Sequence, residues 1–184
     1  MSHTVEIKNL AVINANVTNG SIQDENSGIL GGFVYDVNIS NAFTEGVTTG
    51  GGLVGSLRGS VATNCYSLVS STNGAFVVDN LGSHITNCFS ASDDCGFCLL
   101  QDLKNSAVIN SFATTISGIS MENPGFIKYK MDGAITKCYY SDNYTTGIYY
   151  DKSSDTNNLI AKPESFFKTK STYTTASNWD SSSP

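Results

Sequence analysis

Short apolar stretches alternate with asparagine and glycine along the chain. Six segments align when they are written in register on one position: Asn14, Asn41, Asn64, Asn87, Asn110 and Lys137. The steps between these positions are 27, 23, 23, 23 and 27 residues. Each unit also carries a glycine followed by apolar residues, and we align Gly52-Leu53-Val54 with Gly74-Ala75-Phe76 and Gly96-Phe97-Cys98. One repeat therefore contains two short apolar stretches with turn residues between them, and the longer steps predict loops within residues 18–28 and 114–123.

A period near 23 residues is too short for a pair of helices and fits one turn of a β-solenoid, whose coils bury their apolar side against each other. The repeats are rich in β-branched, aromatic and turn-forming residues and show no sustained spacing of 3.6. We therefore expect an all-β fold: a parallel β-helix (β-solenoid) of about six coils, stacked ~4.8 Å apart. Asparagine would occupy one recurrent bend and glycine the other corner.

The end of the chain departs from this repeat. We expect solenoid repeats over residues 1–150 and a C-terminal cap with a polar tail over residues 151–184. A short helix is predicted after Pro163, from Glu164 in its first turn and Lys168 near its end, with Phe166 and Phe167 on its buried side. This helix would cap the open end of the stack, where a solenoid would otherwise expose an edge.

Residues 51–67, GGLVGSLRGSVATNCYS, resemble the GLUG motif: Gly-Gly-Leu-Val-Gly, a glycine turn, Ile or Val, Asn, a small residue and Tyr. The matching positions are Gly51, Gly52, Leu53, Val54, Gly55, Gly59, Val61, Asn64 and Tyr66. The resemblance covers roughly residues 5–150, with Lys137 in place of Asn in the last unit. It implies a right-handed β-helix segment of a large surface or adhesin protein. Because the first repeat begins partway into a coil, we expect further segments of a longer chain on either side.

The composition argues against nucleic acid and membrane as partners. The chain has 184 residues and a formal charge of −6, and its ten Lys and Arg residues include a single arginine, Arg58. A surface that follows phosphates needs clustered Lys and Arg, so no nucleic-acid partner is expected. No apolar run reaches ~18 residues, so no membrane insertion is expected. Residues 1–10 lack the pattern of a signal peptide.

The five cysteines favour packing over chemistry, although their redox state stays open. Cys95 and Cys98 form a Cys-x-x-Cys motif, but no helix is predicted after it. We assign Cys98 to an apolar column with Val34, Val54 and Ile127. Cys65, Cys88 and Cys138 are assigned to a column of small residues, where side chains in register point the same way, so a disulfide is disfavoured.

No metal site and no cofactor is expected. His3 and His84 are isolated from other ligands, and the loop carboxylates, such as Asp151 and Asp155, match no calcium loop. Among the carboxylates near the register residues, only Asp79 and Asp102 share a column. Their carboxylates would lie about 5 Å apart, a separation that a retaining glycosidase would tolerate. A solvated acidic column is favoured because no cleft residue is evident around them, and no catalytic residue is predicted.

Two groups of aromatic residues are candidates for ligand contact. The column Phe43, Tyr66, Phe89, Phe112 and Tyr139 is predicted to be a core ladder rather than a sugar-stacking face, because it offers the largest apolar burial. The candidate ligand site is the group past the last coil: Tyr140, Asp142, Tyr144, Tyr149 and Tyr150. It mixes rings with a carboxylate and would suit carbohydrate if exposed; packing against the cap is the alternative.

The leading interpretation is a noncatalytic β-solenoid spacer or recognition module of an extracellular, cell-surface or adhesin-like protein, with a glycan or a host or surface protein as its partner. Two alternatives stay open. One is a carbohydrate-active enzyme remnant, lyase-like or hydrolase-like, using Asp79 and Asp102. The other is an intracellular structural or filament-associated protein, which free cysteines would suit.

Overall fold

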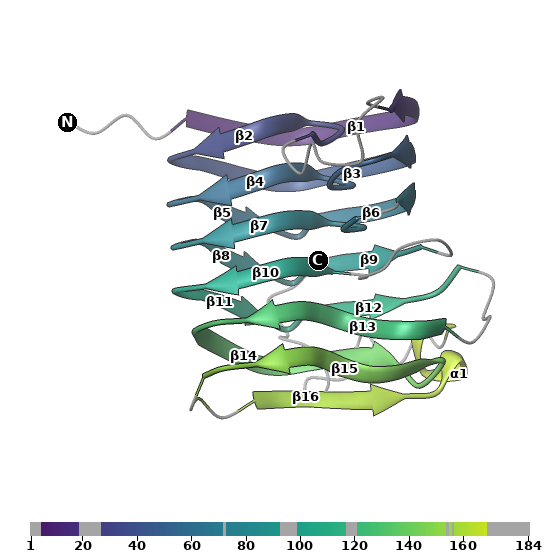
Figure 1. Ribbon diagram of the computed structural model, residues 1–184. Coiled ribbons are helices and arrows are strands. Elements are labelled where there is room, and N and C mark those ends of the chain that lie inside the picture. The colour runs from purple at the N-terminus through teal and green to yellow at the C-terminus, as the bar shows by residue number, and fades with distance from the viewer. Residues whose placement is uncertain are drawn as a thin grey trace.

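The computed structural model describes residues 5–18, 27–71, 73–92, 99–116, 121–153, 155 and 157–168. The chain winds into a β-solenoid of about five turns, with parallel strands stacked one above another and one short helix near the C-terminus (Figure 1). The predicted all-β solenoid is therefore confirmed. The predicted loops at 18–28 and 114–123 lie partly outside the described residues, and His3, Cys95 and Cys98 lie wholly outside them.

Two sheets build the solenoid. Six strands form one face, in the stacking order β15 (Tyr144–Asp151), β13 (Met121–Lys130), β10 (Leu100–Lys104), β7 (Val77–Leu81), β4 (Val54–Arg58) and β2 (Gly31–Tyr35). The other sheet follows the order β1 (Val5–Val17), β3 (Val37–Thr48), β5 (Val61–Thr63), β8 (His84–Thr86), β11 (Ser106–Ile109), β14 (Gly133–Ser141), β12 (Phe112–Thr114), β9 (Phe89–Ala91) and β6 (Tyr66–Ser71). Stacking continues past residue 150, because β16 (Asn157–Lys162) pairs with β14.

The second sheet bends around a corner. The long strand β3 pairs with both β5 and β6, and β14 pairs with both β11 and β12. A middle coil accordingly contains three strands, such as β4, β5 and β6, where the sequence pattern predicts two apolar stretches. The additional strand has only three residues in β5 and β8. Such a segment is too short to show a periodic pattern of its own.

Both recurrent corners use left-handed backbone. At one corner Asn41, Asn64, Asn87, Asn110 and Lys137 have φ between 47° and 54°. At the other corner Asp36, Gly59, Gly82 and Asn105 have φ between 48° and 61°. Glycine and asparagine adopt this conformation more readily than other residues do. The Asn64 amide donates to Asn41 Oδ1 at 3.4 Å and the Asn87 amide to Asn64 Oδ1 at 3.2 Å, which confirms the asparagine column.

The residue that follows each corner is small and hydrogen-bonds to the backbone. Ser60 Oγ donates to the Arg58 carbonyl at 2.8 Å, and the Ser60 N–H donates to Ser83 Oγ at 3.0 Å. At the asparagine corner the thiols of Cys65 and Cys88 point at carbonyl oxygens two residues before them, at 3.2 Å in both cases. These side chains satisfy polar groups of a buried corner, which explains why the column holds small residues.

Strand β1 corrects the predicted register of the first coil. Leu10 pairs with Ala42, so Asn9, and not Asn14, stands opposite Asn41. The Asn41 amide donates to Asn9 Oδ1 at 3.1 Å. Asn14 also has a positive φ of 56° but lies where the register of β1 shifts. Two asparagines in one β-prone segment look alike in the sequence, and only the pairing with β3 selects between them.

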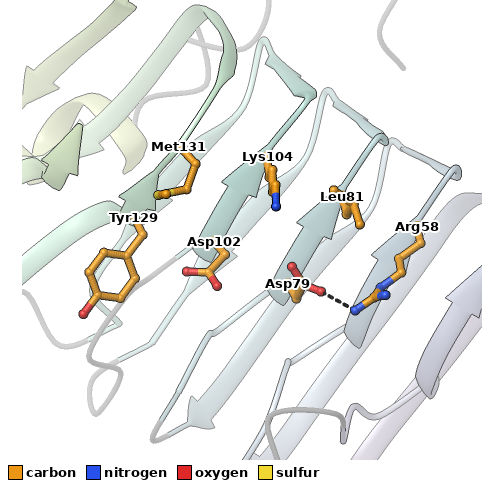
Figure 2. Close-up of a pocket in the computed structure, with 7 residues that line it drawn as sticks. All are labelled: Arg58, Asp79, Leu81, Asp102, Lys104, Tyr129 and Met131. Atoms are coloured by element: carbon orange, nitrogen blue, oxygen red, sulfur yellow. Dashed lines mark hydrogen bonds and ion pairs between the residues drawn. The ribbon is translucent and has the colours of Figure 1, made fainter. Parts of the chain in front are cut away.

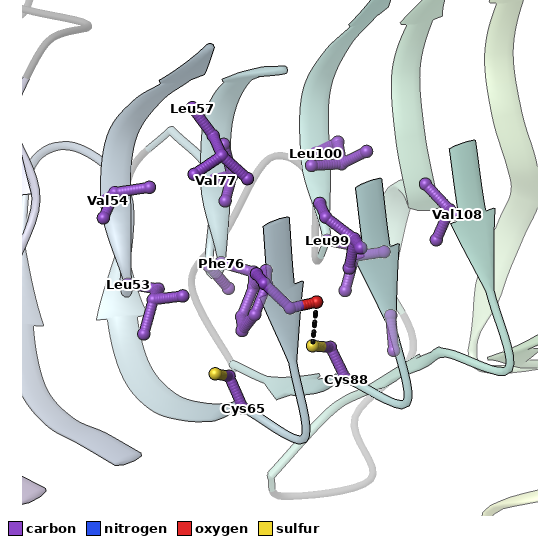
Figure 3. Packing of buried hydrophobic residues seen from close by; sticks show 14 of the residues in the cluster. Leu53, Val54, Leu57, Cys65, Phe76, Val77, Cys88, Leu99, Leu100 and Val108 are labelled. Atoms are coloured by element: carbon purple, nitrogen blue, oxygen red, sulfur yellow. Dashed lines mark hydrogen bonds between the residues drawn. The ribbon is translucent and has the colours of Figure 1, made fainter. Parts of the chain in front are cut away.

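The core runs along the solenoid axis as stacked columns of apolar side chains (Figure 3). One column contains Val54, Val77, Leu100 and Ile127, all fully buried. The predicted column is wrong here, because Leu100 rather than Cys98 occupies it, and Val34 pairs with Leu57 instead. The sequence alignment matched Gly52 with Gly74, one residue short of the 23-residue step that the strands use.

The helix α1 (Glu164–Lys168) forms where the sequence predicts it. Phe167 stacks on Phe112, with 5.4 Å between the ring centroids, and Phe166 lies 5.2 Å from Tyr139. The Glu164 carboxylate accepts hydrogen bonds from Thr114 Oγ1 (2.9 Å), Ser141 Oγ (3.3 Å) and Asn143 Nδ2 (3.4 Å). These contacts place the helix on the flank of the stack, against residues of β12 and β14.

Candidate functional site

The six-stranded sheet carries two rows of outward side chains that cross its strands. One row contains Phe33, Ser56, Asp79, Asp102, Tyr129 and Tyr150, and the parallel row contains Tyr35, Arg58, Leu81, Lys104 and Met131. Their central members, Arg58, Asp79, Leu81, Asp102, Lys104, Tyr129 and Met131, line a pocket of about 370 Å³. We call these two rows, with the pocket at their centre, the strand-face groove. Figure 2 shows the residues of this pocket on β4, β7, β10 and β13, with Met131 just past the end of β13.

Arg58 links three groups at one end of the groove. Its guanidinium lies 2.9 Å from Asp79 Oδ2 and 5.1 Å from the centre of the Phe33 ring. Nε of Arg58 donates to Ser56 Oγ at 3.0 Å, and Ser56 Oγ donates to Asp79 Oδ2 at 3.1 Å. Desolvation lowers the pKa of Arg58, but hydrogen bonds to Asp79 and Tyr35 outweigh it and raise the pKa. The Asp79 carboxylate is thus held by a guanidinium and a hydroxyl.

The predicted column of Asp79 and Asp102 is confirmed, because these residues pair directly across β7 and β10. Asp102 is half-buried, and Lys104 on the same strand is exposed. At the far end of the row, the rings of Tyr129 and Tyr150 lie 6.3 Å apart in an edge-on arrangement. The groove therefore has cationic hydrogen-bond donors and anionic acceptors at its centre. Aromatic residues lie at both of its ends.

Sequence reasoning missed most of this site. It noted Arg58 as the single arginine but did not place it beside Asp79. The signal was available: Phe33, Ser56, Asp79 and Asp102 follow one another at the same 23-residue step as the asparagines. Extending the asparagine register to every position of the repeat aligns the row from Phe33 to Tyr129, but not Tyr150, which follows Tyr129 after 21 residues. The glycine alignment, one residue short, concealed it.

The structure does not bring the predicted ligand group together. Tyr144 is 3% exposed and belongs to the core, and Tyr140 packs against the core. Asp142 lies in an exposed turn, where its N–H donates to the Lys162 carbonyl at 2.9 Å. Tyr149 and Tyr150 are 68% and 49% exposed, and only Tyr150 joins the rows described above. Alternation along β14 and β15 sends neighbouring side chains in different directions.

The aromatic column on the flank corrects another prediction, because it is not a ladder inside the core. Its rings stack, with centroids 4.3 Å apart for Phe43 and Tyr66 and 4.6 Å for Phe89 and Phe112. Tyr66 is nevertheless 42% exposed. The fully buried neighbours of these rings are small residues: Thr44, Ser67, Ser90 and Ala113. The aromatic side chains therefore face outward, and only Phe112 and Tyr139 are buried, beneath α1.

Cys65, Cys88 and Cys138 are buried in one column, as predicted, and each has a free thiol. A hydrogen bond with Cys88 lowers the pKa of Cys65. Burial raises the pKa of Cys88 well above its usual value and that of Cys138 to about 12. Cys88 and Cys138 therefore stay protonated at neutral pH, and buried protonated thiols act as small packing residues rather than as nucleophiles.

Asp151 and Asp155, considered above as calcium ligands, surround a buried lysine instead. Lys130 Nζ lies 3.7 Å from Asp151 Oδ1 and 3.9 Å from Asp155 Oδ2, and it contacts Ser153 Oγ. Burial raises the pKa of Asp151, but hydrogen bonds from Ser153 and Asn157 and the charge of Lys130 outweigh this effect and lower it. Within the described residues, no three His, Cys, Asp or Glu side chains are grouped as metal ligands.

No family model, curated protein or solved structure matches the chain. Of the residues that the structure describes, none forms a helix long and apolar enough to cross a membrane.

Proposed function

We propose that the protein is a noncatalytic β-solenoid recognition module of a cell-surface or adhesin-like protein, and that the strand-face groove is its recognition surface. The observation that carries this proposal is the groove itself. Stacked parallel strands hold charged and aromatic side chains in fixed rows, so little conformational entropy is lost on binding. The resemblance of residues 51–67 to the GLUG motif favours the same setting, as part of a longer surface polypeptide.

The environment of Asp79 favours binding over catalysis. A carboxylate that acts as a base or a nucleophile must be available to the substrate. Asp79 is instead engaged by Arg58 and by Ser56 at 2.9 and 3.1 Å. Fixed hydrogen-bonding groups of this kind suit recognition of a polar ligand.

Binding and turnover should be measured together. Purified protein is applied to an array of glycans and surface glycoproteins, and each ligand it captures is incubated with it and analysed for shortened products. Retention of a ligand without any change in its length supports a recognition module. Release of shortened or unsaturated products contradicts the noncatalytic proposal.

The cellular setting needs a separate test. Antibodies against the solenoid should label intact source cells before permeabilisation. Labelling only after permeabilisation would favour the third interpretation, an intracellular structural protein, with which the three buried free thiols are compatible.

A carbohydrate-active enzyme is the second candidate, and the pairing of Asp79 with Asp102 is what favours it. Neighbouring parallel strands lie ~4.8 Å apart, close to the carboxylate separation of retaining glycosidases. If the protein cleaves a polysaccharide, Asp79→Asn and Asp102→Asn should each abolish cleavage and leave the circular dichroism spectrum unchanged. Cleavage that survives both substitutions would exclude this pair as the catalytic residues.

A further inference from the structure

We propose that the ligand of the strand-face groove is an extended neutral polysaccharide that lies across the strands, from Phe33 and Tyr35 towards Tyr129 and Tyr150. This inference rests on the proposed recognition function and adds the chemical class, the direction and the length of the ligand.

The charges of the groove select a neutral ligand. The pocket at its centre holds two cations, Arg58 and Lys104, and two anions, Asp79 and Asp102, while the Lys128 ammonium lies beside it, 4.9 Å from the centre of the Tyr129 ring. The guanidinium of Arg58 is already engaged by Asp79 and lies over the Phe33 ring. A polymer of uronates, sulfates or phosphates would meet Asp102 and a protein of net charge −6, and the cations that line the described pocket are Arg58, which Asp79 engages, and Lys104. A basic peptide would meet Arg58 and Lys104.

The backbone of the groove argues against a peptide strand as the ligand. A peptide that adds to a sheet needs an unpaired strand edge. The strands beneath the groove, β4, β7, β10 and β13, each pair with a neighbour on both sides. A ligand in the groove can therefore contact only side chains. Carboxylates, an ammonium and a guanidinium provide both acceptors and donors, which match the hydroxyl groups of sugars.

The aromatic residues set the direction and length. Phe33 and Tyr35 are 54% and 62% exposed at one end, and Tyr150 is 49% exposed at the other. Their flat apolar rings complement the apolar faces of sugar rings, with polar edges left for hydrogen bonds. From β2 to β15 the row crosses six neighbouring strands, a span of ~24 Å at ~4.8 Å per step. This span fits several consecutive sugars rather than a monosaccharide.

Isothermal titration calorimetry with defined sugars tests the inference. The probes are neutral β-glucan, mannan, xylan and chitin oligosaccharides from the monosaccharide to the octasaccharide, with polygalacturonate and heparin as acidic comparators. We expect affinity for at least one neutral series to rise with length and level off where the ligand fills the rows. Because the contacts are not ionic, raising the salt concentration should change this affinity less than about twofold.

Variants locate the site. Tyr129→Ala and Tyr150→Ala should each weaken binding roughly tenfold, the effect of losing one aromatic contact. Tyr66→Ala is the control matched to Tyr150→Ala: it removes a tyrosine of similar exposure on the flank, and this variant should bind like the unmodified protein. Equal losses in all three variants, or no loss at Tyr129 and Tyr150, would overturn the placement of the ligand.

The outcomes separate this inference from the proposed function. Binding only to acidic polymers with strong salt dependence, or only to a surface protein, overturns the neutral ligand but leaves a recognition module. An affinity that does not depend on oligosaccharide length overturns the extended ligand. Cleavage of the oligosaccharides, or no binding to any sugar or surface protein, overturns the proposed function as well.

Discussion

Two outward-facing aromatic surfaces of this solenoid differ in whether the chain itself covers them. On the flank, Phe112 is 5% exposed because Phe167 of α1 stacks upon it. On the six-stranded face, Tyr150 is 49% exposed, at the end of its row. Both positions are aromatic residues that recur in register with neighbouring coils. An aromatic column in a solenoid can therefore be assigned to the core or to a ligand site only when the segment that covers it is known.

The aromatic column on the flank contains both covered and exposed rings. Beyond the helix, Tyr66 belongs to the same column as Phe112 but is 42% exposed. The cover depends on polar contacts as well as rings, since Glu164 accepts hydrogen bonds from three side chains of β12, β14 and the turn after β14. Substitutions on each surface test whether covered and open aromatic residues contribute differently to stability.

The largest effect is expected from Phe112→Ala. Removal of a buried ring that is sandwiched between Phe89 and Phe167 should lower the free energy of unfolding by about 3 kcal/mol. Tyr66→Ala, in the exposed part of the same column, should cost about 1 kcal/mol or less. Urea denaturation followed by circular dichroism measures both. Equal losses would mean that the helix does not distinguish the two halves of the column.

Glu164→Ala should have an intermediate effect. It leaves Thr114, Ser141 and Asn143 without their shared acceptor, and we expect a loss of about 1–2 kcal/mol. Hydrogen exchange in β12 and α1 should become faster while exchange in β4 and β7 stays unchanged. Lys168→Ala is the control, because its ion pair with Glu164 is exposed and should contribute less than about 0.5 kcal/mol. Unchanged exchange in α1 would contradict a role for Glu164 in holding the helix.

Asp151→Asn tests the end of the six-stranded face, with an expected loss of about 1 kcal/mol at neutral pH. The pKa of Asp151 is lowered in the folded protein, below the unfolded value of about 3.9. Its contribution is therefore complete above about pH 4 and is lost as the pH falls through the lowered folded-state pKa. The two proteins should converge in stability as the pH falls below this lowered pKa. Asp142→Asn, in an exposed turn, is the control variant, and a difference for Asp151→Asn that stays constant as the pH falls through the acid range would contradict this account.

The smallest effect on stability is expected from Tyr150→Ala, at less than about 0.5 kcal/mol. Nothing in the described structure covers this ring from outside, so its removal opens no cavity. Thermal denaturation in the absence of ligand is the measurement. A loss as large as that of Phe112→Ala would show that part of the molecule packs over the groove, and the surface would no longer be open to a ligand.

Much of the fold could be predicted from the sequence. The 23-residue step fixed the solenoid and placed Asn41, Asn64 and Asn87 at one corner, because left-handed backbone tolerates few other residues. The pairing of Asp79 with Asp102 followed from the same step. The first coil and the glycine columns were misplaced, since two asparagines, or two glycines one residue apart, are equivalent until a neighbouring strand selects one.

The candidate site was harder to predict, and so was the exposure of the aromatic column. Burial was assigned to that column from the hydrophobicity of its rings, whereas Thr44, Ser67 and Ser90 occupy the interior instead. On this side of the solenoid the small residues point inward and the large rings point outward. Hydrophobicity ranks residues for burial but does not say which side of a strand faces the axis.

In the middle coils, the 23-residue step of the sequence is enough to predict which of the corner asparagines and which aspartates stack, because the repeat length sets the step from each coil to the next. Which stacks of side chains are exposed to solvent follows only from the tertiary structure. Phe112 is covered by a helix far along the chain, while Tyr129 and Tyr150 lie on the six-stranded face and Arg58 there turns towards Asp79. Exposure depends on contacts between segments distant in sequence, and such contacts leave no periodic signal in the segments they join.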